Sequence, residues 1–364
     1  MLCLSPAKGG LEMVAVDTVK NIAQFGYAIA LEKSWVAESL SNLPDVDIYL
    51  SSKLSMRHFP YFSALKIAHW IQEKNILLLH IHWAKDLPLA TLVKKILIAK
   101  HYNKLQLVVS RHMSLPHTKK SLYHRWIYSS VDAYISVCDF VHKQAKCNLP
   151  IPTDKLYRIY PGVDALEPSK KPPFVIDSKN INIIVLGRLE PAKGQHLMLQ
   201  ALAHLSNPNI HCYFVGHAMD NSYLTELKNL ASSLGVAPNI TFCSFIQQPA
   251  QYLAHFDALI LTTRCETFGL VLIEAMRSGI LAIGSRAGGV TEIIEHQKTG
   301  LLFTTENATS LSEQLEWFIS HPSEINAIAL AGKKRAEQLF NKKANYRVLA
   351  YTLKKLSNDS EAAL

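Results

Sequence analysis

The chain has 364 residues, of which 49% are hydrophobic and 18% are charged. It is therefore long enough for two domains with full-sized cores, and it is neither disordered nor fibrous. The formal net charge is +9, and residues 1–170 hold 21 basic and 13 acidic side chains, which accounts for +8 of it. This excess indicates nucleic acid, anionic lipid or an acidic substrate as a partner, unless it is only a scattered solvated surface.

The cysteines and the first residues bear on the cellular compartment. The six cysteines show no C-x-x-C spacing, which indicates free thiols in a reducing environment and predicts no zinc site. Met1 is not followed by a basic region and a long apolar stretch, so we expect no signal peptide. No apolar run approaches the length of a membrane span. These features predict a cytoplasmic protein.

Short apolar runs alternate with helical patterns along the first half of the chain. This alternation is typical of parallel α/β layers. Residues 1–5 predict the first strand, and a glycine loop at residues 8–12 leads into a helical pattern that reaches about Gly26. Further strands of the same sheet are expected at residues 27–31, 47–50, 76–82, 105–110 and 133–137.

A polar, proline-rich stretch at residues 166–180 predicts a linker. A second alternating series begins after it and ends in helical patterns at residues 331–340 and 345–356. Its strands are expected at residues 181–186, 210–215, 240–243, 258–263 and 281–284. The sequence therefore predicts two domains with sheets of similar size, at residues 1–165 and 181–340.

The first strand of the second domain leads into a loop that suits an anion. Gly187 and Gly194 allow a close backbone approach, while Arg188 and Lys193 supply positive charge and several N–H donors. The helix that is expected to start near Gln195 adds the positive end of its dipole. The loop thus predicts a phosphate site, and a polar surface turn is the alternative.

Two glutamates eight positions apart, Glu266 and Glu274, form the most informative pair in the sequence. Glu266 is expected on the loop that leaves the strand at residues 258–263, and Glu274 about two turns into a helix that stops near Gly279. In an open α/β sheet ligands bind beyond the carboxyl ends of the strands. The two carboxylates could therefore accept hydrogen bonds from sugar hydroxyls, or they could be two solvated surface charges.

Three further features of the sequence could be structural elements and not metal or ligand sites. Asp45-Val46-Asp47 has the D-x-D spacing of some metal sites, but it precedes a strand of the first domain and is interpreted as a turn. His80 and His82 share one face of a strand, and we favour packing or acceptor-side contacts over zinc because no third ligand is evident. Gly288-Gly289 predicts a packing turn.

Seven short motifs follow one another along the chain, at residues 9–12, 160–164, 187–194, 214–216, 266–274, 287–292 and 299–303. In this order they resemble glycosyltransferase family 4, a group of retaining enzymes with the GT-B fold. The resemblance implies an α/β protein with two Rossmann-like doubly wound domains that face each other across a cleft. Residues 1–165 would bind the acceptor and residues 181–340 the nucleotide sugar, and residues 341–364 would form a helix that crosses back to the first domain.

The resemblance also implies roles in catalysis. Arg188 and Lys193 would hold the diphosphate of the donor and stabilise the leaving group as negative charge develops. Glu266 would bind hydroxyls of the donor sugar. His112 would face that sugar and form a hydrogen bond to it, although a structural histidine at a strand end is an equally good interpretation.

The substrate-binding residues are implied in the same way. Glu274 would bind the ribose of the nucleotide. Phe268, Gly269 and Leu270 would contact the sugar or the phosphate through their backbone N–H groups. Gly9 and Gly10 would let the first loop approach the donor phosphate and the acceptor.

The implied function is the transfer of a sugar from a UDP- or GDP-sugar to a glycan or lipid-linked acceptor, without a metal or other cofactor. A role in cell-surface polysaccharide or lipopolysaccharide biosynthesis would fit. Residues 117–126 mix basic and aromatic side chains, which predicts peripheral contact with the inner face of an anionic cytoplasmic membrane.

Three other classes of protein would show different sequence features. A catalytically inactive GT-B relative that serves as a partner subunit is the main alternative, although the intact Arg188, Lys193, Glu266 and Glu274 argue against it. A nucleic-acid-binding protein should carry base-reading or stacking motifs, and none is found. A nicotinamide-dependent dehydrogenase should carry G-x-G-x-x-G after the first strand, and the Gly9-Gly10 loop does not match this pattern.

Overall fold

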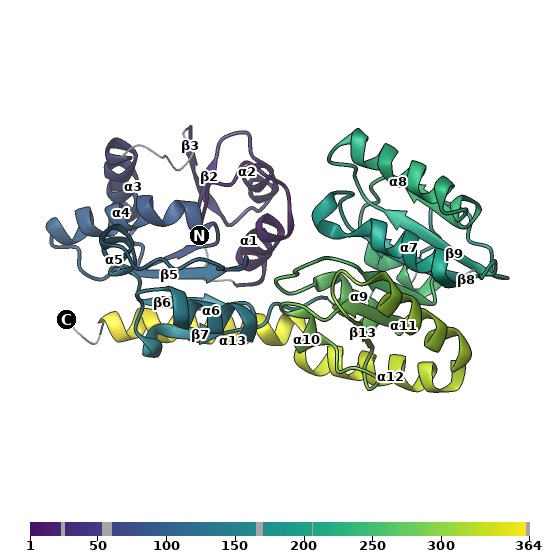
Figure 1. Ribbon diagram of the computed structural model, residues 1–364. Coiled ribbons are helices and arrows are strands. Elements are labelled where there is room, and N and C mark those ends of the chain that lie inside the picture. Colours follow the sequence, from purple (N-terminus) through teal and green to yellow (C-terminus); the bar gives the residue numbers. More distant parts are fainter. Residues whose placement is uncertain (23–25, 53–59, 165–169, 206, 362–364) are drawn as a thin grey trace. The chain divides into compact units, whose positions relative to one another are not determined.

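The computed structural model describes residues 1–22, 26–52, 60–164, 170–205 and 207–361. The chain divides into two compact units (Figure 1). Unit 1 comprises Met1–Pro161 together with Lys343–Leu364, and unit 2 comprises Gly162–Lys342. The described residues include no helix that is long and apolar enough to cross a membrane.

Unit 1 contains a parallel sheet with the strand order β3-β2-β1-β4-β5-β6-β7. Its strands are β1 (Leu2–Cys3), β2 (Tyr27–Leu31), β3 (Asp47–Ser51), β4 (Leu78–Ile81), β5 (Gln106–Arg111), β6 (Ala133–Ser136) and β7 (Leu156–Arg158). The order reverses between β1 and β4, which is the switch point where ligands bind in doubly wound sheets. The sequence patterns did not predict β7, because three residues are too few to show a periodicity.

Helices cover both faces of this sheet. On one face, α3 (Tyr61–Glu73), α4 (Leu87–Ala99), α5 (Leu122–Tyr128) and α6 (Asp139–Asn148) pack on side chains such as Leu79 and Val109. On the other face, α1 (Gly10–Asn21) and α2 (Trp35–Ser41) pack on Ala28 and Ala30. The helical pattern expected to reach Gly26 ends at Asn21, and residues 23–25 lie outside the described residues.

The last helix, α13 (Lys342–Glu361), belongs to unit 1 from Lys343 onward. Its Leu349 and Leu353 pack with Ile22, Val108 and Ile135, on the sheet face that α1 also covers. Burial of these apolar side chains stabilises the position of the helix on unit 1.

Unit 2 contains a second parallel sheet with the strand order β10-β9-β8-β11-β12-β13. Its strands are β8 (Ile181–Leu186), β9 (Ile210–Val215), β10 (Ile240–Cys243), β11 (Ala258–Leu261), β12 (Leu281–Ser285) and β13 (Leu301–Phe303). Its helices are α7 (Gln195–Leu205), α8 (Asn221–Ser233), α9 (Leu270–Ser278), α10 (Val290–Ile293), α11 (Ala308–Ser320) and α12 (Pro322–Leu339). In the described parts of the two units, 3₁₀ turns lie at Ala84–Asp86, Thr153–Lys155, Pro191–Lys193, Ala237–Asn239 and Pro249–His255. The strand order reverses between β8 and β11, so this sheet has a switch point of the same kind.

Residues 170–180, which were expected to belong to a linker, pack on unit 2. The Phe174 ring stacks on Tyr213 with 5.4 Å between the ring centroids, and it also contacts Phe256. The Tyr213 hydroxyl donates a hydrogen bond to the carbonyl of Val175 over 3.3 Å. The proline-rich composition hid these aromatic contacts, because one phenylalanine in a polar stretch gives no periodic signal.

Candidate functional site

The loops that follow β8 and β11 carry most of the predicted site residues. These two strands are neighbours in the sheet and run parallel, so both loops leave the sheet at the same edge. Arg188 and Lys193 lie on the β8 loop, and Glu266 lies on the β11 loop. The switch point of unit 2 therefore brings basic and acidic side chains together.

The β8 loop starts with Gly187, which touches Gly216 at the end of the neighbouring strand β9. Gly187 has a φ of +149° and Gly216, which follows β9, has a φ of +156°. A Cβ atom on Gly216 would lie 2.0 Å from the carbonyl oxygen of Gly187. Only glycine allows the two backbones to come this close, and this crossing fixes the path of the chain just before Arg188.

The main chain of Lys193 is fixed to the end of β11. The Thr262 hydroxyl donates a hydrogen bond to the carbonyl of Lys193 over 2.7 Å. Gly194 has a φ of +68°, and a Cβ atom there would lie 2.5 Å from the carbonyl oxygen of Thr262. Lys193 ends the 3₁₀ turn Pro191–Lys193, and helix α7 begins directly after Gly194. The base of the Lys193 side chain is therefore held in place by backbone contacts.

Lys193 and Glu266 form an ion pair. The ammonium Nζ donates to Glu266 Oε2 over 2.9 Å, and the two side chains are 26% and 20% exposed. The other oxygen, Glu266 Oε1, accepts a hydrogen bond from the backbone N–H of Thr267 over 3.2 Å. An ion pair of this kind is stronger than a neutral hydrogen bond, and its partial exposure leaves it accessible to a ligand.

Arg188 extends the basic part of the site. Its Nη2 lies 3.0 Å from Glu190 Oε1, and its side chain is 57% exposed. A guanidinium offers five N–H donors, so a single contact to Glu190 leaves several donors for an anion. Arg188 and Lys193 thus give two cationic groups on one loop.

The Gly288-Gly289 turn packs against the backbone of the Glu266 loop. Gly289 N–H donates to the carbonyl of Glu266 over 3.0 Å. Gly288 has a φ of +59°, and a Cβ atom there would lie 2.0 Å from the same carbonyl oxygen. A Cβ atom on Gly289 would lie 2.3 Å from the carbonyl oxygen of Thr267. These glycines therefore form a packing turn whose small size lets the Glu266 loop sit where it does.

Helix α9 starts immediately after the Glu266 loop. Gly269 is its N-cap in the left-handed conformation, with a φ of +97°, and it supplies no side-chain hydrogen bond to the first turn. Phe268 is buried and packs edge-on against Phe340, with 5.6 Å between the ring centroids. Leu270 is the first helical residue. The aromatic anchor fixes the start of a helix whose N-terminal turn is left without a side-chain cap.

Glu274 lies in α9, in the second turn rather than two turns from the start, because the helix begins only at Leu270. The eight-residue spacing from Glu266 is therefore not a helical spacing, since the residues before Leu270 form a loop. Glu274 is partly exposed at its surface, yet burial of its carboxyl group raises its pKa from 4.5 to about 7. The two glutamates thus differ: Glu266 is paired with a cation, and Glu274 is destabilised in its charged form.

Gln195 is a residue of this site that the sequence did not reveal. It is 1% exposed, and its Nε2 donates to the carbonyl of Arg188 over 2.7 Å. The Tyr223 hydroxyl lies 3.5 Å from Gln195 Oε1. Gln195 stands where the sequence predicts only a helix start, and a buried glutamine at such a place could have indicated a structural hydrogen bond to the preceding loop.

The candidate residues of unit 1 follow the carboxyl ends of β1 and β5, the strands on either side of β4. Gly9 is the N-cap of α1 with an extended backbone, and a Cβ atom on Gly10 would meet nothing within 4 Å. Packing inside unit 1 therefore does not require glycine at position 10. The buried carboxylate of Glu12, in the first turn of α1, accepts a hydrogen bond from the Ser5 hydroxyl and holds this loop to the end of β1.

His112 follows β5 and contacts a second histidine. Its Nε2 lies 3.0 Å from Nδ1 of His82, which follows β4, and the two rings are nearly parallel. Burial lowers the pKa of His112 to about 4 and places the pKa values of His80 and His82 well below 6.5. All three imidazoles are therefore neutral near pH 7. His80 and His82 belong to the predicted pair of strand histidines, and His82 connects that pair to His112.

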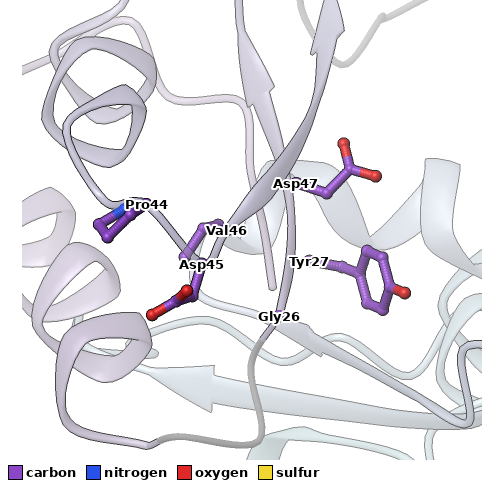
Figure 2. Close-up of a pocket in the computed structure, with 6 residues that line it drawn as sticks. All are labelled: Gly26, Tyr27, Pro44, Asp45, Val46 and Asp47. Atoms are coloured by element: carbon purple, nitrogen blue, oxygen red, sulfur yellow. The ribbon is translucent and has the colours of Figure 1, made fainter.

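The Asp45-Val46-Asp47 segment lies at the amino end of β3, away from the carboxyl ends of the strands. Asp45 is in a turn and Asp47 is the first residue of β3. The segment lines a shallow cavity of about 430 Å³ together with Gly26, Tyr27 and Pro44. Figure 2 shows the carboxylates of Asp45 and Asp47 directed to different sides, and Asp47 forms a 2.7 Å ion pair with Lys74. Among the described residues no group of three or more His, Cys, Asp or Glu side chains is arranged to hold a metal ion.

Comparisons with known proteins identify the family of both units. A family model described as Glycosyltransferase Family 4 matches residues 8–165, and one described as Glycosyl transferases group 1 matches residues 167–335. The two models together account for nearly the whole chain, which belongs to the family 4 glycosyltransferases. It is a glycosyltransferase of the hexosyltransferase type, and its two doubly wound units are those of the GT-B fold class.

Individual relatives are distant. The chain is 25% identical over 325 residues to N-acetyl-alpha-D-glucosaminyl L-malate synthase of Bacillus anthracis, an alignment that covers 85% of this chain and 84% of the relative. It is 29% identical over 164 residues to GDP-mannose-dependent alpha-(1-6)-phosphatidylinositol monomannoside mannosyltransferase of Mycolicibacterium smegmatis, which covers 42% of each protein. The crystal structure of Anabaena HepE in complex with UDP and glucose has a similar fold, with a TM-score of 0.81, 21% identity, and coverage of 97% of this chain and 98% of that one.

Proposed function

We propose that the chain is a retaining glycosyltransferase that uses a UDP- or GDP-sugar and needs no metal ion or other cofactor. The observation that carries this proposal is the Lys193–Glu266 ion pair, with Arg188 on the same loop as Lys193, at the switch point of a doubly wound sheet. A nucleotide sugar has an anionic diphosphate next to a hydroxyl-rich ring. A site with cations on one loop and a carboxylate on the adjacent loop matches this order of groups.

Lys193 and Glu266 have more hydrogen-bond donors and acceptors than their ion pair uses, and these can bind such a ligand. The Lys193 ammonium has three N–H groups, so it can keep its bond to Glu266 and also donate to a phosphate oxygen. Each oxygen of the Glu266 carboxylate has two lone-pair positions, and each makes one hydrogen bond that is described above. Glu266 can therefore accept hydrogen bonds from hydroxyls of the sugar while Lys193 and Arg188 neutralise the diphosphate.

In the proposed reaction the bond between the sugar anomeric carbon and the phosphate oxygen breaks, and the acceptor oxygen bonds to that carbon on the same face. The proton of the acceptor hydroxyl moves to the leaving phosphate. Arg188 and Lys193 stabilise the negative charge that develops on the leaving group. The mechanism uses no carboxylate nucleophile, unlike that of retaining glycoside hydrolases, and Glu266 holds the sugar in position.

The other residues take supporting roles in this proposal. Glu274 binds the ribose, and the backbone N–H groups of Phe268, Gly269 and Leu270 contact the sugar or the phosphate. Gly10 leaves the space beside the first loop open for the donor phosphate and the acceptor, because packing in unit 1 does not require a glycine there. His112 donates a hydrogen bond to the donor sugar.

We further propose that the acceptor is a glycan or a lipid-linked glycan, in cell-surface polysaccharide or lipopolysaccharide biosynthesis, and that unit 1 touches an anionic membrane. Leu122 and Tyr123 of α5 are 86% and 57% exposed. They lie next to Lys119, Lys120 and Arg125 in the sequence. Exposed apolar side chains among basic ones suit the interface of an anionic bilayer, and the mannosyltransferase relative is named for a phosphatidylinositol monomannoside.

The donor is tested by thermal unfolding with UDP, GDP and a panel of their sugars. A ligand at about one hundred times its Kd should stabilise the protein by about 2.7 kcal/mol. We expect a shift with one nucleotide series and a much smaller shift in Lys193→Ala. A panel that leaves the melting temperature of the wild-type protein unchanged would contradict the proposed donor site.

The membrane contact is tested by sedimentation with vesicles. Retention on anionic vesicles should fall when salt is raised and when Lys119 and Lys120 are both changed to Ala, whereas neutral vesicles should retain little protein. Weak retention that does not respond to salt would contradict this part of the proposal and would leave the donor site unaffected.

A further inference from the structure

Two polar contacts link β4 to β5 in unit 1. His80 Nε2 lies 2.8 Å from the hydroxyl of Ser110, and His82 Nδ1 lies 3.0 Å from His112 Nε2. Both contacts join residues that are 30 positions apart, whereas directly paired residues of β4 and β5 are 28 apart, so each contact reaches the residue two positions beyond the register partner. His80, His82 and Ser110 are 0%, 2% and 4% exposed. The contacts form a short ladder that leads from the buried strands to His112 at the edge of the sheet.

The protonation of the His82–His112 contact follows from burial. Since both rings are neutral, each carries one N–H, and only one of the two rings can donate across the contact. The other nitrogen of His82, Nε2, is buried and has no hydrogen-bond partner among the described residues. If His82 accepted from His112, its own N–H would be at this Nε2 position and would be buried without an acceptor.

The opposite arrangement leaves no buried N–H unpaired. If His82 donates from Nδ1, its Nε2 carries only a lone pair, and an unsatisfied buried acceptor is tolerated better than an unsatisfied buried N–H. His112 then accepts at Nε2 and must carry its proton on Nδ1. His112 is partly exposed, and its Nδ1 makes no hydrogen bond to a described residue.

We infer that His82 is a positioning residue that fixes His112 as the Nδ1–H tautomer, so that His112 offers a hydrogen-bond donor and no base at the edge of the sheet. The inference rests on the proposed function only where it assigns an oxygen of the sugar donor as the acceptor of that N–H. A ring held in one tautomer and one orientation offers its donor without reorganisation during the reaction.

The tautomer can be measured directly on the full chain. Histidine labelled with nitrogen isotope allows long-range proton–nitrogen NMR correlations that distinguish Nδ1–H from Nε2–H, and loss of signals in His112→Gln assigns the ring. We expect Nδ1–H for His112 in the wild-type protein. The expected tautomer should persist in His82→Asn, whose amide N–H lies near the position of the imidazole Nδ1–H, and should be lost in His82→Leu. An Nε2–H tautomer in the wild-type protein would overturn the inference without any substitution.

Kinetics provide the second readout. Loss of an outer hydrogen-bond partner typically costs about 10- to 100-fold, so kcat of His82→Leu should fall by about this factor while KM for the nucleotide sugar changes by less than about twofold. His82→Asn should recover most of the activity. His80→Asn, which alters the contact to Ser110 and the ring contact to His82 but leaves the His82–His112 hydrogen bond in place, is the matched control and should keep the His112 tautomer. A loss of kcat of equal size in His82→Asn would count against the positioning role. If the chain transfers no sugar at all, the proposed function fails, and the NMR experiment still decides the tautomer.

Discussion

The switch points of the two sheets have the same strand plan and different chemistry. At the β8–β11 edge of unit 2 an ion pair and a guanidinium lie on adjacent loops. At the β1–β4 edge of unit 1 glycines and neutral histidines take their place. The net charge of the sequence shows the opposite distribution. Residues 1–170 carry +8 of the net +9, although the charged site lies in unit 2. Net charge along a chain therefore does not locate the charged site, which depends on the loops that the topology brings to one edge.

The largest expected effect concerns the β8–β11 edge of unit 2. Lys193→Ala should lower kcat by about 10²- to 10³-fold, as removal of one group that stabilises charge in the transition state does in other enzymes. Steady-state assays with the nucleotide sugar found in the binding screen measure this loss. The free energy of unfolding should change by less than about 1 kcal/mol, because the ion pair is partly exposed. Lys193→Arg is the control that keeps the charge. A fully active Lys193→Ala protein would remove the basis for the phosphate role.

The second prediction concerns the neutral histidines of unit 1. His80, His82 and His112 have pKa values below the usual 6.5 in the folded protein because burial disfavours their charged forms. Their stabilising contribution is present above about pH 6.5 and is lost as the pH falls toward the folded values. Each histidine that takes up a proton on unfolding lowers the stability by about 1.4 kcal/mol per pH unit. Chemical unfolding between about pH 7 and pH 5, followed by tryptophan fluorescence, measures this slope.

Tryptophan fluorescence suits this measurement because Trp35, Trp70, Trp83 and Trp126 are in unit 1 and only Trp317 is in unit 2. His82→Asn removes one of the three titrating rings and should give a shallower slope. An unchanged slope would show that the histidine ladder does not couple folding to pH.

The third prediction separates the two glutamates. Burial raises the pKa of Glu274 to about 7, so its stabilising contribution is complete below its usual pKa of 4.5 and is lost as the pH rises through about 7. Glu274→Gln should therefore be more stable than the wild-type protein at about pH 8, by about 1–2 kcal/mol after allowance for its partial exposure, and the difference should vanish near pH 5.

The same variant should bind the nucleotide about tenfold less tightly, because a neutral amide replaces a charged acceptor of hydrogen bonds. Thermal unfolding at several pH values and a nucleotide titration test both parts. Glu266→Gln is the matched comparison, and it should show no such gain in stability because Glu266 is paired with Lys193. Equal behaviour of the two variants would contradict the distinction between the glutamates.

The smallest expected effect concerns the hydrogen bond that Gln195 donates to the loop of Arg188. Gln195→Leu keeps the volume of the side chain but removes the hydrogen bond to the carbonyl of Arg188. The loss of one hydrogen bond corresponds to about 1 kcal/mol, so KM for the nucleotide sugar should rise about fivefold. Tyr223→Phe keeps the hydrogen bond from Gln195 to Arg188, removes the longer contacts of the hydroxyl to Gln195 and His196, and should change KM by less than about twofold. If both variants match the wild-type protein, Gln195 does not position the loop.

Much of the fold was evident in the sequence, with exceptions that share a cause. All eleven of the runs predicted as strands correspond to strands, because apolar runs of four to seven residues between turn signals are specific enough for a parallel sheet. β7 and β13 have three residues each and give no periodicity. The packing of Phe174 was missed for a similar reason, since a single aromatic residue in a polar stretch does not predict its partners.

By itself the sequence determined the kinds of residue at the site and the loops that carry them. Arg188, Lys193 and Glu266 each follow a strand, and a loop that follows a parallel strand must lie at the carboxyl edge of the sheet. Tertiary structure alone decided which of them touch. Lys193 and Glu266 are 73 positions apart and meet because β8 and β11 are neighbours, and His82 meets His112 because β4 lies beside β5. The shifted pKa values of Glu274 and His112 were also decided there, since desolvation depends on what the folded chain packs around a group and not on the residues that precede or follow it.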